Sequence, residues 1–352
     1  MNRWKAAGCA LLALSLAGWA VDARMFLACW LAAWWWSLGL ALGAFTNAWM
    51  HRLAGGSWGE RIVPAALALG SRVPWLLLGA LPILAGLSHL YPWAAEPRGA
   101  WLTDIRQPGF VEAWLSEPFF AARLALYAIA WAWLCRPASL LSKQRAAVSM
   151  MVHAAVTSLA SVDLLMSLVP GWYSTGFGLR VLAAQALGGS AFAVLAAARG
   201  LPSAERVPSA GHPPVARDLG NLLLMWTLVW AYLAFMEFLV IWAENLPREI
   251  QWFVPRLQSG WRFAALALVV LQLAVPTLAL LFRSVKDRPR RLRAVALVVL
   301  CASALDTVWL VLPSVDPHGL HGLWIAPAMF VGVALLLRPA PEPATEAMHA
   351  HA

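Results

Sequence analysis

The strongest constraint on this chain is a series of continuous apolar runs, each about 20 residues long, which is the length that spans a bilayer as an α-helix. A membrane β-barrel would instead place apolar residues at every second position. Only 12% of the 352 residues are charged, about half the share found in soluble domains. The sequence therefore predicts an all-α integral membrane protein.

We predict about ten transmembrane helices. The predicted spans are residues 5–21, 25–49, 61–87, 117–136, 146–169, 175–198, 218–243, 261–282, 293–312 and 322–337. The chain then divides into a first helix, a first set of four spans, a second set of four, a last helix and a tail, which are residues 1–24, 25–170, 171–313, 314–338 and 339–352. Residues 1–24 also fit a cleaved signal peptide, because Arg3 and Lys5 precede the apolar run. The tail is rich in Pro, Ala, Glu and His, and this composition predicts disorder.

The loop charges predict the orientation of these spans. With the N-terminus in the cytoplasm, 17 Lys and Arg residues fall in inside segments and six fall in outside segments. Both termini are therefore expected on the cytoplasmic side of a bacterial inner membrane. Most of the basic residues behind the net charge of +9 lie between the apolar runs, so they indicate membrane topology rather than nucleic-acid binding. The basic run at 284–293 is expected to anchor a cytoplasmic loop beside anionic lipid.

Five ionisable residues lie inside predicted spans at a similar depth. Seven residues separate Asp163 from Pro170 at the outer end of its span, which places this carboxylate about 10 Å below that end. The five residues are Arg123, Asp163, Arg180, Glu237 and Asp306. The same estimate of depth places all of them in the outer third of the membrane. Intramembrane charges usually pair and face a bundle interior or a wet cavity. Asp163 and Arg180 are thus candidates for a purely structural pair, or the set forms a polar pocket or proton route.

His153 is the one histidine inside a predicted span, deeper than Asp163 and on a different helix face. It is a candidate member of a proton relay, and a core histidine with a satisfied hydrogen bond explains it equally well. A haem-b site needs paired histidines, and the four cysteines are single. We therefore expect no metal site and no directly bound redox cofactor.

A weak internal repeat links the two sets of four spans. Asp163 and Pro170 correspond to Asp306 and Pro313 at an offset of 143 residues. The same offset relates Lys143 to Lys286 and Arg145 to Arg288. Because four spans preserve orientation, the two sets would be related in a parallel sense.

Four stretches of the chain resemble a known family. They are WWWSLGLALGAFTNAWMHRLAGGSWG (34–59), SVDLLMSLVPGWYSTGFG (161–178), WAYLAFMEFLVIWAENLPREIQWFVPRLQSGW (230–261) and ALDTVWLVLP (304–313). Together they resemble the second large membrane subunit (ActF) of bacterial alternative complex III, within the superfamily of NrfD and polysulfide reductase membrane subunits. The third stretch is the most specific, and it departs from the family pattern in having Glu237 where Gln is expected.

The resemblance implies two four-helix bundles, spans 2–5 and 6–9, with the first and last helices peripheral. It also implies a subunit of a quinol:cytochrome c or quinol:acceptor oxidoreductase that carries no redox centre itself. Such a subunit would support assembly and proton transfer, with quinone or quinol nearby. The implied partners are an ActC-like membrane subunit, iron–sulfur and c-type haem subunits and a terminal oxidase. Asp163 and Asp306 match carboxylate positions of that family.

Two other classes compete with this interpretation. A stand-alone transporter would also place paired charges in the membrane. A haem-handling protein is suggested by the 22 tryptophans. It would need outward-facing histidines, for which only His89, His318 and His321 qualify.

Overall fold

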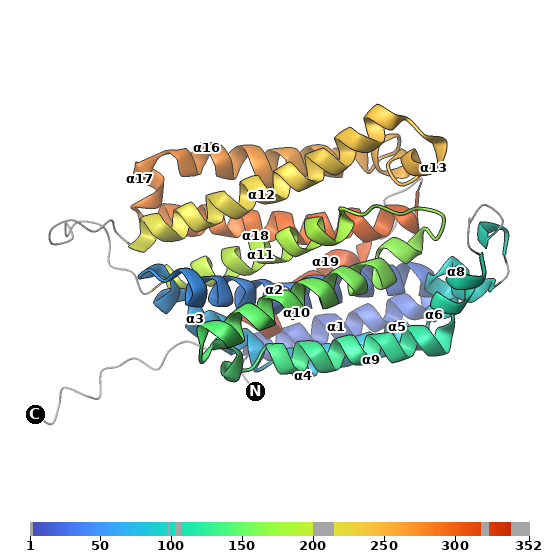
Figure 1. The fold of residues 1–352 in the computed structure, drawn as a ribbon, viewed down its shortest axis with the longest axis horizontal. Helices are drawn as coiled ribbons and strands as arrows, with labels where there is room; N and C mark the ends of the chain where they lie inside the picture. Colours follow the sequence, from blue (N-terminus) through green and yellow to red (C-terminus); the bar gives the residue numbers. More distant parts are fainter. Residues whose placement is uncertain (1–2, 98, 103–107, 200–214, 318–323, 339–352) are drawn as a thin grey trace, which may run out of the picture.

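The computed structural model describes residues 3–97, 99–102, 108–199, 215–317 and 324–338, and within them every regular element is a helix or helical turn (Figure 1). The predicted disorder of residues 339–352 lies outside the described residues, as do His318 and His321. The long helices run side by side, with α8 and α13 at one end and α3 and α17 at the other. We call these the predicted outer end and the predicted inner end, following the loop charges.

The helices that make up the spans follow the predicted bounds closely, although some spans consist of two or more short helices. They are α1 (Arg3–Val21), α2 (Ala23–Ala54), α3 (Trp58–Gly70), α4 (Val73–Leu77), α5 (Leu81–Ala85), α9 (Glu117–Leu134), α10 (Lys143–Leu164), α11 (Phe177–Ala197), α12 (Val215–Glu244), α15 (Arg262–Leu268), α16 (Val275–Leu281), α18 (Pro289–Val311) and α19 (Ala326–Leu337). A π-helix, η5 (Val269–Ala274), joins α15 to α16. Short elements complete the connections: η1 (Leu78–Ala80), α6 (Leu87–Leu90), α7 (Pro92–Ala95), η2 (Ala100–Leu102), α8 (Pro108–Trp114), η3 (Pro137–Leu140), η4 (Met166–Leu168), α13 (Pro247–Ile250), α14 (Val254–Leu257), α17 (Arg283–Lys286) and η6 (Leu312–Ser314).

Seven helices of the described chain are long and apolar enough to cross a membrane. An eighth span is reached if α3 and the helix that follows it, bent by 47° at Ser71–Arg72, are one span. The remaining two predicted spans are the helices α9 and α19, which fall outside this count; α19 has only 12 residues, and the 18 residues of α9 include Glu117 and Arg123. The chain is therefore an all-α, multi-pass membrane protein, and the count of ten spans stays a prediction.

Helix α2 is the centre of the molecule. In its most apolar stretch 94% of the residues are buried, against 17% in α1 and in α12. Figure 1 shows α2, α10 and α11 between an edge formed by α12 and α16 and an edge formed by α1 and α9. Asp22 starts α2 by accepting a hydrogen bond from the backbone N–H of Met25, as a helix N-cap does. The outward faces of the helices at these two edges therefore face lipid.

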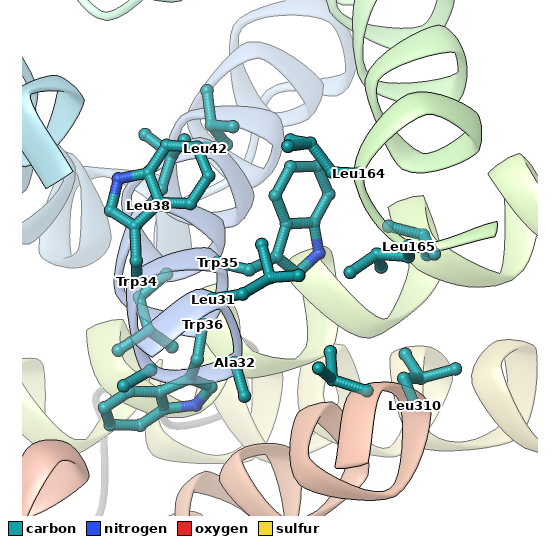
Figure 2. Packing of buried hydrophobic residues seen from close by; sticks show 14 of the residues in the cluster. Leu31, Ala32, Trp34, Trp35, Trp36, Leu38, Leu42, Leu164, Leu165 and Leu310 are labelled. Atoms are coloured by element: carbon teal, nitrogen blue, oxygen red, sulfur yellow. The ribbon is translucent and has the colours of Figure 1, made fainter. Parts of the chain in front are cut away.

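The three consecutive tryptophans of α2 contact three different elements (Figure 2). Trp34 donates from Nε1 to the carbonyl of Leu76 in α4, at 2.6 Å. Trp35 packs edge-on against Trp131 of α9, and Trp36 donates to the Ser303 hydroxyl of α18 at 2.9 Å. Because all three side chains are buried, they join both halves of the chain to its central helix and do not face lipid.

Helices α2 and α11 approach each other through glycine. Gly39 and Gly43 are four residues apart on α2, and Gly189 faces them from α11. A Cβ on Gly43 would collide with the carbonyl of Gln185, and one on Gly189 would collide with the backbone of Ala44. Small residues at this spacing let membrane helices pack at the shortest possible distance, where van der Waals attraction is strongest.

Gly43→Ala should therefore force α2 and α11 apart and destabilise the fold by about 3 kcal/mol. The measurement is the thermal unfolding midpoint of the purified chain in mild detergent. Gly109→Ala is the matched control, since a Cβ there would meet no atom within 4 Å. Equal midpoints for the two variants would contradict the assigned contact.

At the predicted inner end a bidentate ion pair ties α12 to the segment before α18. Arg217 donates from Nε and Nη2 to the two carboxylate oxygens of Asp287, at 2.9 and 2.7 Å. The hydrogen bond from Arg217 holds the pKa of Asp287 below its ordinary value, against the effect of partial burial. A carboxylate with a lowered pKa stabilises the fold above its unfolded pKa of about 3.9.

We predict that this contribution is lost as the pH falls through the pKa of folded Asp287. In Asp287→Asn the unfolding midpoint should fall at neutral pH and converge with that of the parent chain at low pH. Unfolding midpoints measured between neutral and acidic pH test this. Glu60→Gln, which removes an exposed carboxylate of α3, should run parallel to the parent chain throughout.

Candidate functional site

The five intramembrane charges form two separate clusters rather than one layer. Asp163 of α10 pairs with Arg123 of α9, whereas Arg180 of α11 pairs with Glu237 of α12 and Asp306 of α18. The suggested pair of Asp163 with Arg180 is therefore wrong. The two residues follow each other in sequence, but their side chains leave the α10–α11 hairpin toward different neighbouring helices.

The first cluster surrounds one carboxylate with four donors. Asp163 accepts from Arg123 Nε and Nη2 at 2.7 and 3.0 Å, from the Tyr127 hydroxyl at 2.7 Å and from Trp114 Nε1 at 2.9 Å. The Arg123 guanidinium also lies 4.1 Å from the centroid of the Trp114 ring. Asp163 is 2% exposed and Arg123 6%. These donors, from three side chains on α8 and α9, fix the position of the carboxylate in the bundle.

Below this cluster, α10 presents a column of polar side chains. Ser149, His153, Thr157 and Ser161 are spaced four residues apart and are all buried. His153 Nδ1 lies 3.1 Å from the Thr157 hydroxyl, which also accepts from Trp131 Nε1 at 3.2 Å. Within the described residues, His153 Nε2 and the Ser149 hydroxyl find no partner.

The column begins at a cavity of about 460 Å³ at the predicted inner end. Its polar lining includes Arg136, Ser139, Gln144, Arg145 and Ser149. The column therefore extends along α10 from this cavity to Ser161, two residues before Asp163. His153 is a member of this column, and its Nδ1 contacts the Thr157 hydroxyl while its Nε2 is buried without a partner among the described residues.

The second cluster joins three helices of the other half. Arg180 lies 3.4 Å from Glu237 through Nη1 and 3.3 Å from Asp306 through Nη2. Glu237 also accepts from the Ser174 hydroxyl at 2.8 Å, and Asp306 accepts from Trp230 Nε1 at 3.3 Å. The three charged residues are 1–8% exposed. Two carboxylates thus share one guanidinium.

Arg256 lies next to the second cluster, since it and Arg180 are 5.6 and 5.2 Å from the centroid of the same Trp309 ring. Sequence reasoning missed Arg256 because it lies in the connection between α12 and α15. Its side chain is fully buried, 3.4 Å from the centroid of the Trp252 ring and 2.7 Å from the Leu310 carbonyl. Burial lowers the pKa of Arg256, the charge of Arg180 lowers it further and Glu237 opposes both. The signal in the sequence was the spacing of Trp252 and Arg256, which places an aromatic ring and a cation one helical turn apart.

The second cluster lies between two hollows of very different size. On one side Glu237 lines an open cleft of about 350 Å³, together with Tyr173, Ser174, Glu244 and Glu249. We call this the outer cleft. Partial burial raises the pKa of Glu249, and the hydrogen bond and charge of Glu244 raise it further. The outer cleft is thus acidic and open to protons from the predicted outer side.

On the other side Asp306 lines a small internal cavity of about 20 Å³. The cavity also receives Ser303, Thr307 and Gln185, whose amide nitrogen and oxygen have no partner in the described residues. This volume is enough for one water molecule with several polar neighbours. Sequence reasoning missed Gln185 because a single amide in an apolar helix carries no pattern.

The two clusters resemble each other in their surroundings. Asp163 and Asp306 each accept from an arginine and from an indole N–H, and each precedes a 3₁₀ turn, η4 or η6. Tyr91 donates to the carbonyl of Leu164, as Arg256 does to that of Leu310. The partners themselves do not follow the offset of 143 residues, because Arg123 lies in the fourth predicted span and Arg180 in the sixth, so the internal repeat stays a prediction.

Comparison with known proteins does not extend this assignment. No protein-family model matches the chain, and no curated protein matches it. The class of the protein therefore rests on the fold and the site alone, which are those of an all-α membrane protein with two buried carboxylate–arginine clusters. Among the described residues, no three His, Cys, Asp or Glu side chains gather into a group that could hold a metal ion.

The first cluster yields a stability prediction. Asp163→Asn leaves the Arg123 guanidinium buried without its counter-charge, and we expect a loss of about 3–5 kcal/mol. Arg123→Met combined with Asp163→Asn removes both charges and should recover most of that loss. The unfolding midpoints of the single and double variants in detergent check this. If Asp163→Asn alone is as stable as the parent chain, the carboxylate is not the counter-charge of Arg123.

Proposed function

We propose that the chain is a membrane subunit of a quinol:cytochrome c or quinol:acceptor oxidoreductase of the alternative complex III type. In this role it supports assembly and transfers protons near its predicted outer side, without a redox centre of its own. The observation that carries the proposal is the position of the Glu237–Arg180–Asp306 cluster, between an outer cleft and a small cavity that Asp306 and Gln185 line together with mostly apolar side chains.

The geometry supports proton exchange at Glu237. One oxygen of its carboxylate accepts from Ser174 and the other accepts a long, weak hydrogen bond from Arg180 at 3.4 Å. Arg180 itself keeps its charge in proteins and does not relay a proton. It holds Glu237 and Asp306 in one electrostatic field, so that protonation of one carboxylate strengthens the attraction of the guanidinium for the other.

The remaining polar groups extend this route in both directions. Asp306 and Gln185 line the internal cavity, where one water molecule would connect them. In the other half of the chain, the Ser149–His153–Thr157 column reaches from the inner cavity toward Asp163. Each half thus has a buried carboxylate and a polar approach to it, which is what a subunit with two proton half-channels requires.

The proposed setting is a bacterial inner membrane with both termini on the cytoplasmic side. An ActC-like subunit, iron–sulfur and c-type haem subunits and a terminal oxidase would be its partners, and quinol would be oxidised nearby. The four stretches that resemble the ActF subunits support this setting, and so does the concentration of cations at the predicted inner end.

Isolation of the tagged chain in mild detergent tests the setting. Partners are identified by mass spectrometry, and a reduced-minus-oxidised spectrum of the eluate detects haem. Recovery of c-type haem and iron–sulfur subunits is the expected result. A colourless chain that is reproducibly alone would overturn the assignment to a respiratory complex.

Glu237→Gln tests the proton role in the isolated complex. The amide keeps the hydrogen bond to Ser174 but cannot take up a proton, so protons released per electron during quinol oxidation in proteoliposomes should fall. Glu244→Gln is the matched control, because Glu244 lines the same cleft without contacting Arg180. An unchanged proton yield in Glu237→Gln, with the complex intact, would show that the cluster is structural.

A stand-alone transporter is the second candidate, and one observation favours it. The helix from Arg262 to Leu281 is interrupted by the π-helix η5, in which Gln272 is fully buried and has no partner for its amide among the described residues. Interrupted helices with buried polar groups form ion and substrate sites in transporters. If the chain is isolated without partners, uptake assays with Gln272→Leu are the next measurement.

A further inference from the structure

An apolar groove lies far from the two charge clusters, on the edge formed by the first and last helices. It has a volume of about 470 Å³ and is walled by α1, α2, α4, η1 and α19. The walls are mostly apolar and include Leu12, Trp30, Trp34, Leu76, Met329 and Val333. This size falls within the usual range of small-molecule sites. We call it the peripheral groove.

Two cations close one end of the peripheral groove. Lys5 and Arg72 both belong to its lining. Arg72 donates to the carbonyls of Leu337 and Arg338 at 2.7 and 3.3 Å, so its side chain spans the groove end and holds the last turn of α19. In the described part of the chain, neither cation pairs with a carboxylate, and the lining contains no acidic residue.

The positive charge continues around this end. Arg3 and Arg338 lie 5.0 and 4.6 Å from the ring centroid of Trp4, which places a second pair of cations beside the first. Burial lowers the pKa of Arg199, and the neighbouring charges of Arg293 and Arg338 lower it further. Among the described residues these cations form no ion pair with a carboxylate, so an anion bound beside them would reduce their mutual repulsion.

The surroundings identify what kind of anion fits. The apolar walls lie on a helix edge that faces lipid, and Trp75, which also lines the groove, is 76% exposed there. Tryptophan and cationic side chains together mark the level of lipid headgroups. A ligand for this site must be apolar along the groove and negatively charged at the Lys5–Arg72 end.

We infer that the peripheral groove binds an anionic phospholipid, with an acyl chain along α2 and α19 and its phosphate between Lys5 and Arg72. Basic pockets between membrane helices on the cytoplasmic side recognise such headgroups. A bound lipid would link α1 and α19 to α2 by filling the hollow between them. This inference is independent of the respiratory or transport role.

Native mass spectrometry of the full chain, released from detergent with its bound partners, tests the proposal. Phosphatidylglycerol and phosphatidylcholine with identical acyl chains are titrated, and the apparent Kd of the first bound lipid is measured. We expect phosphatidylglycerol to bind more tightly. Lys5→Gln should weaken phosphatidylglycerol about five-fold, the effect of one cation near an anionic headgroup, and leave phosphatidylcholine unchanged.

Two further variants make the test decisive. Lys143→Gln removes an exposed lysine of the predicted inner end outside the groove, and it should leave both lipids unaffected. Val333→Trp fills the groove and should weaken both lipids equally. Equal affinity of the parent chain for the two lipids would overturn the proposal, as would equal effects of Lys5→Gln and Lys143→Gln.

Discussion

The contact between α2 and α11 is the constraint on which the rest of the structure depends. Gly43 and Gly189 let the two backbones meet without intervening side chains. In a bilayer the lipid tails are as apolar as leucine, so helices gain little by hiding apolar surface and must gain from close packing. This approach places α2 at the centre, and the other elements contact it through its tryptophans and small residues.

The same contact determines where the charges can lie. Because α2 and α11 occupy the middle, Asp163 on α10 and Arg180 on α11 face separate compartments on either side of them. Each charge then needs a partner within its own compartment, and Arg123 and Asp306 provide these partners. A buried charge without a partner would cost several kcal/mol, so Arg123 and Arg180 each lie opposite a carboxylate on a neighbouring helix.

The two clusters differ in how fully their carboxylates are satisfied, and this difference separates structure from chemistry. Four donors at 2.7–3.0 Å hold Asp163 in place. Glu237 and Asp306 face Arg180 at 3.3–3.4 Å and border hollows on both sides. Looser contacts and access to water are what a titrating group requires, so the second cluster is the better candidate for proton exchange, and Asp163 is first of all a structural anchor.

The sequence by itself determined that this is an all-α membrane protein, approximately where its helices lie and which residues carry charge inside them. Those properties depend on local composition, since about 20 apolar residues must form a helix in lipid. Only the tertiary structure decided which charges pair, that Arg256 joins them from a connecting segment, and that Gln185 borders an internal cavity. Pairing depends on which faces of distant helices meet. The rotation of a helix, and hence the direction of each face, is set by packing contacts such as Gly43 against Gln185 and not by the residues of one helix alone.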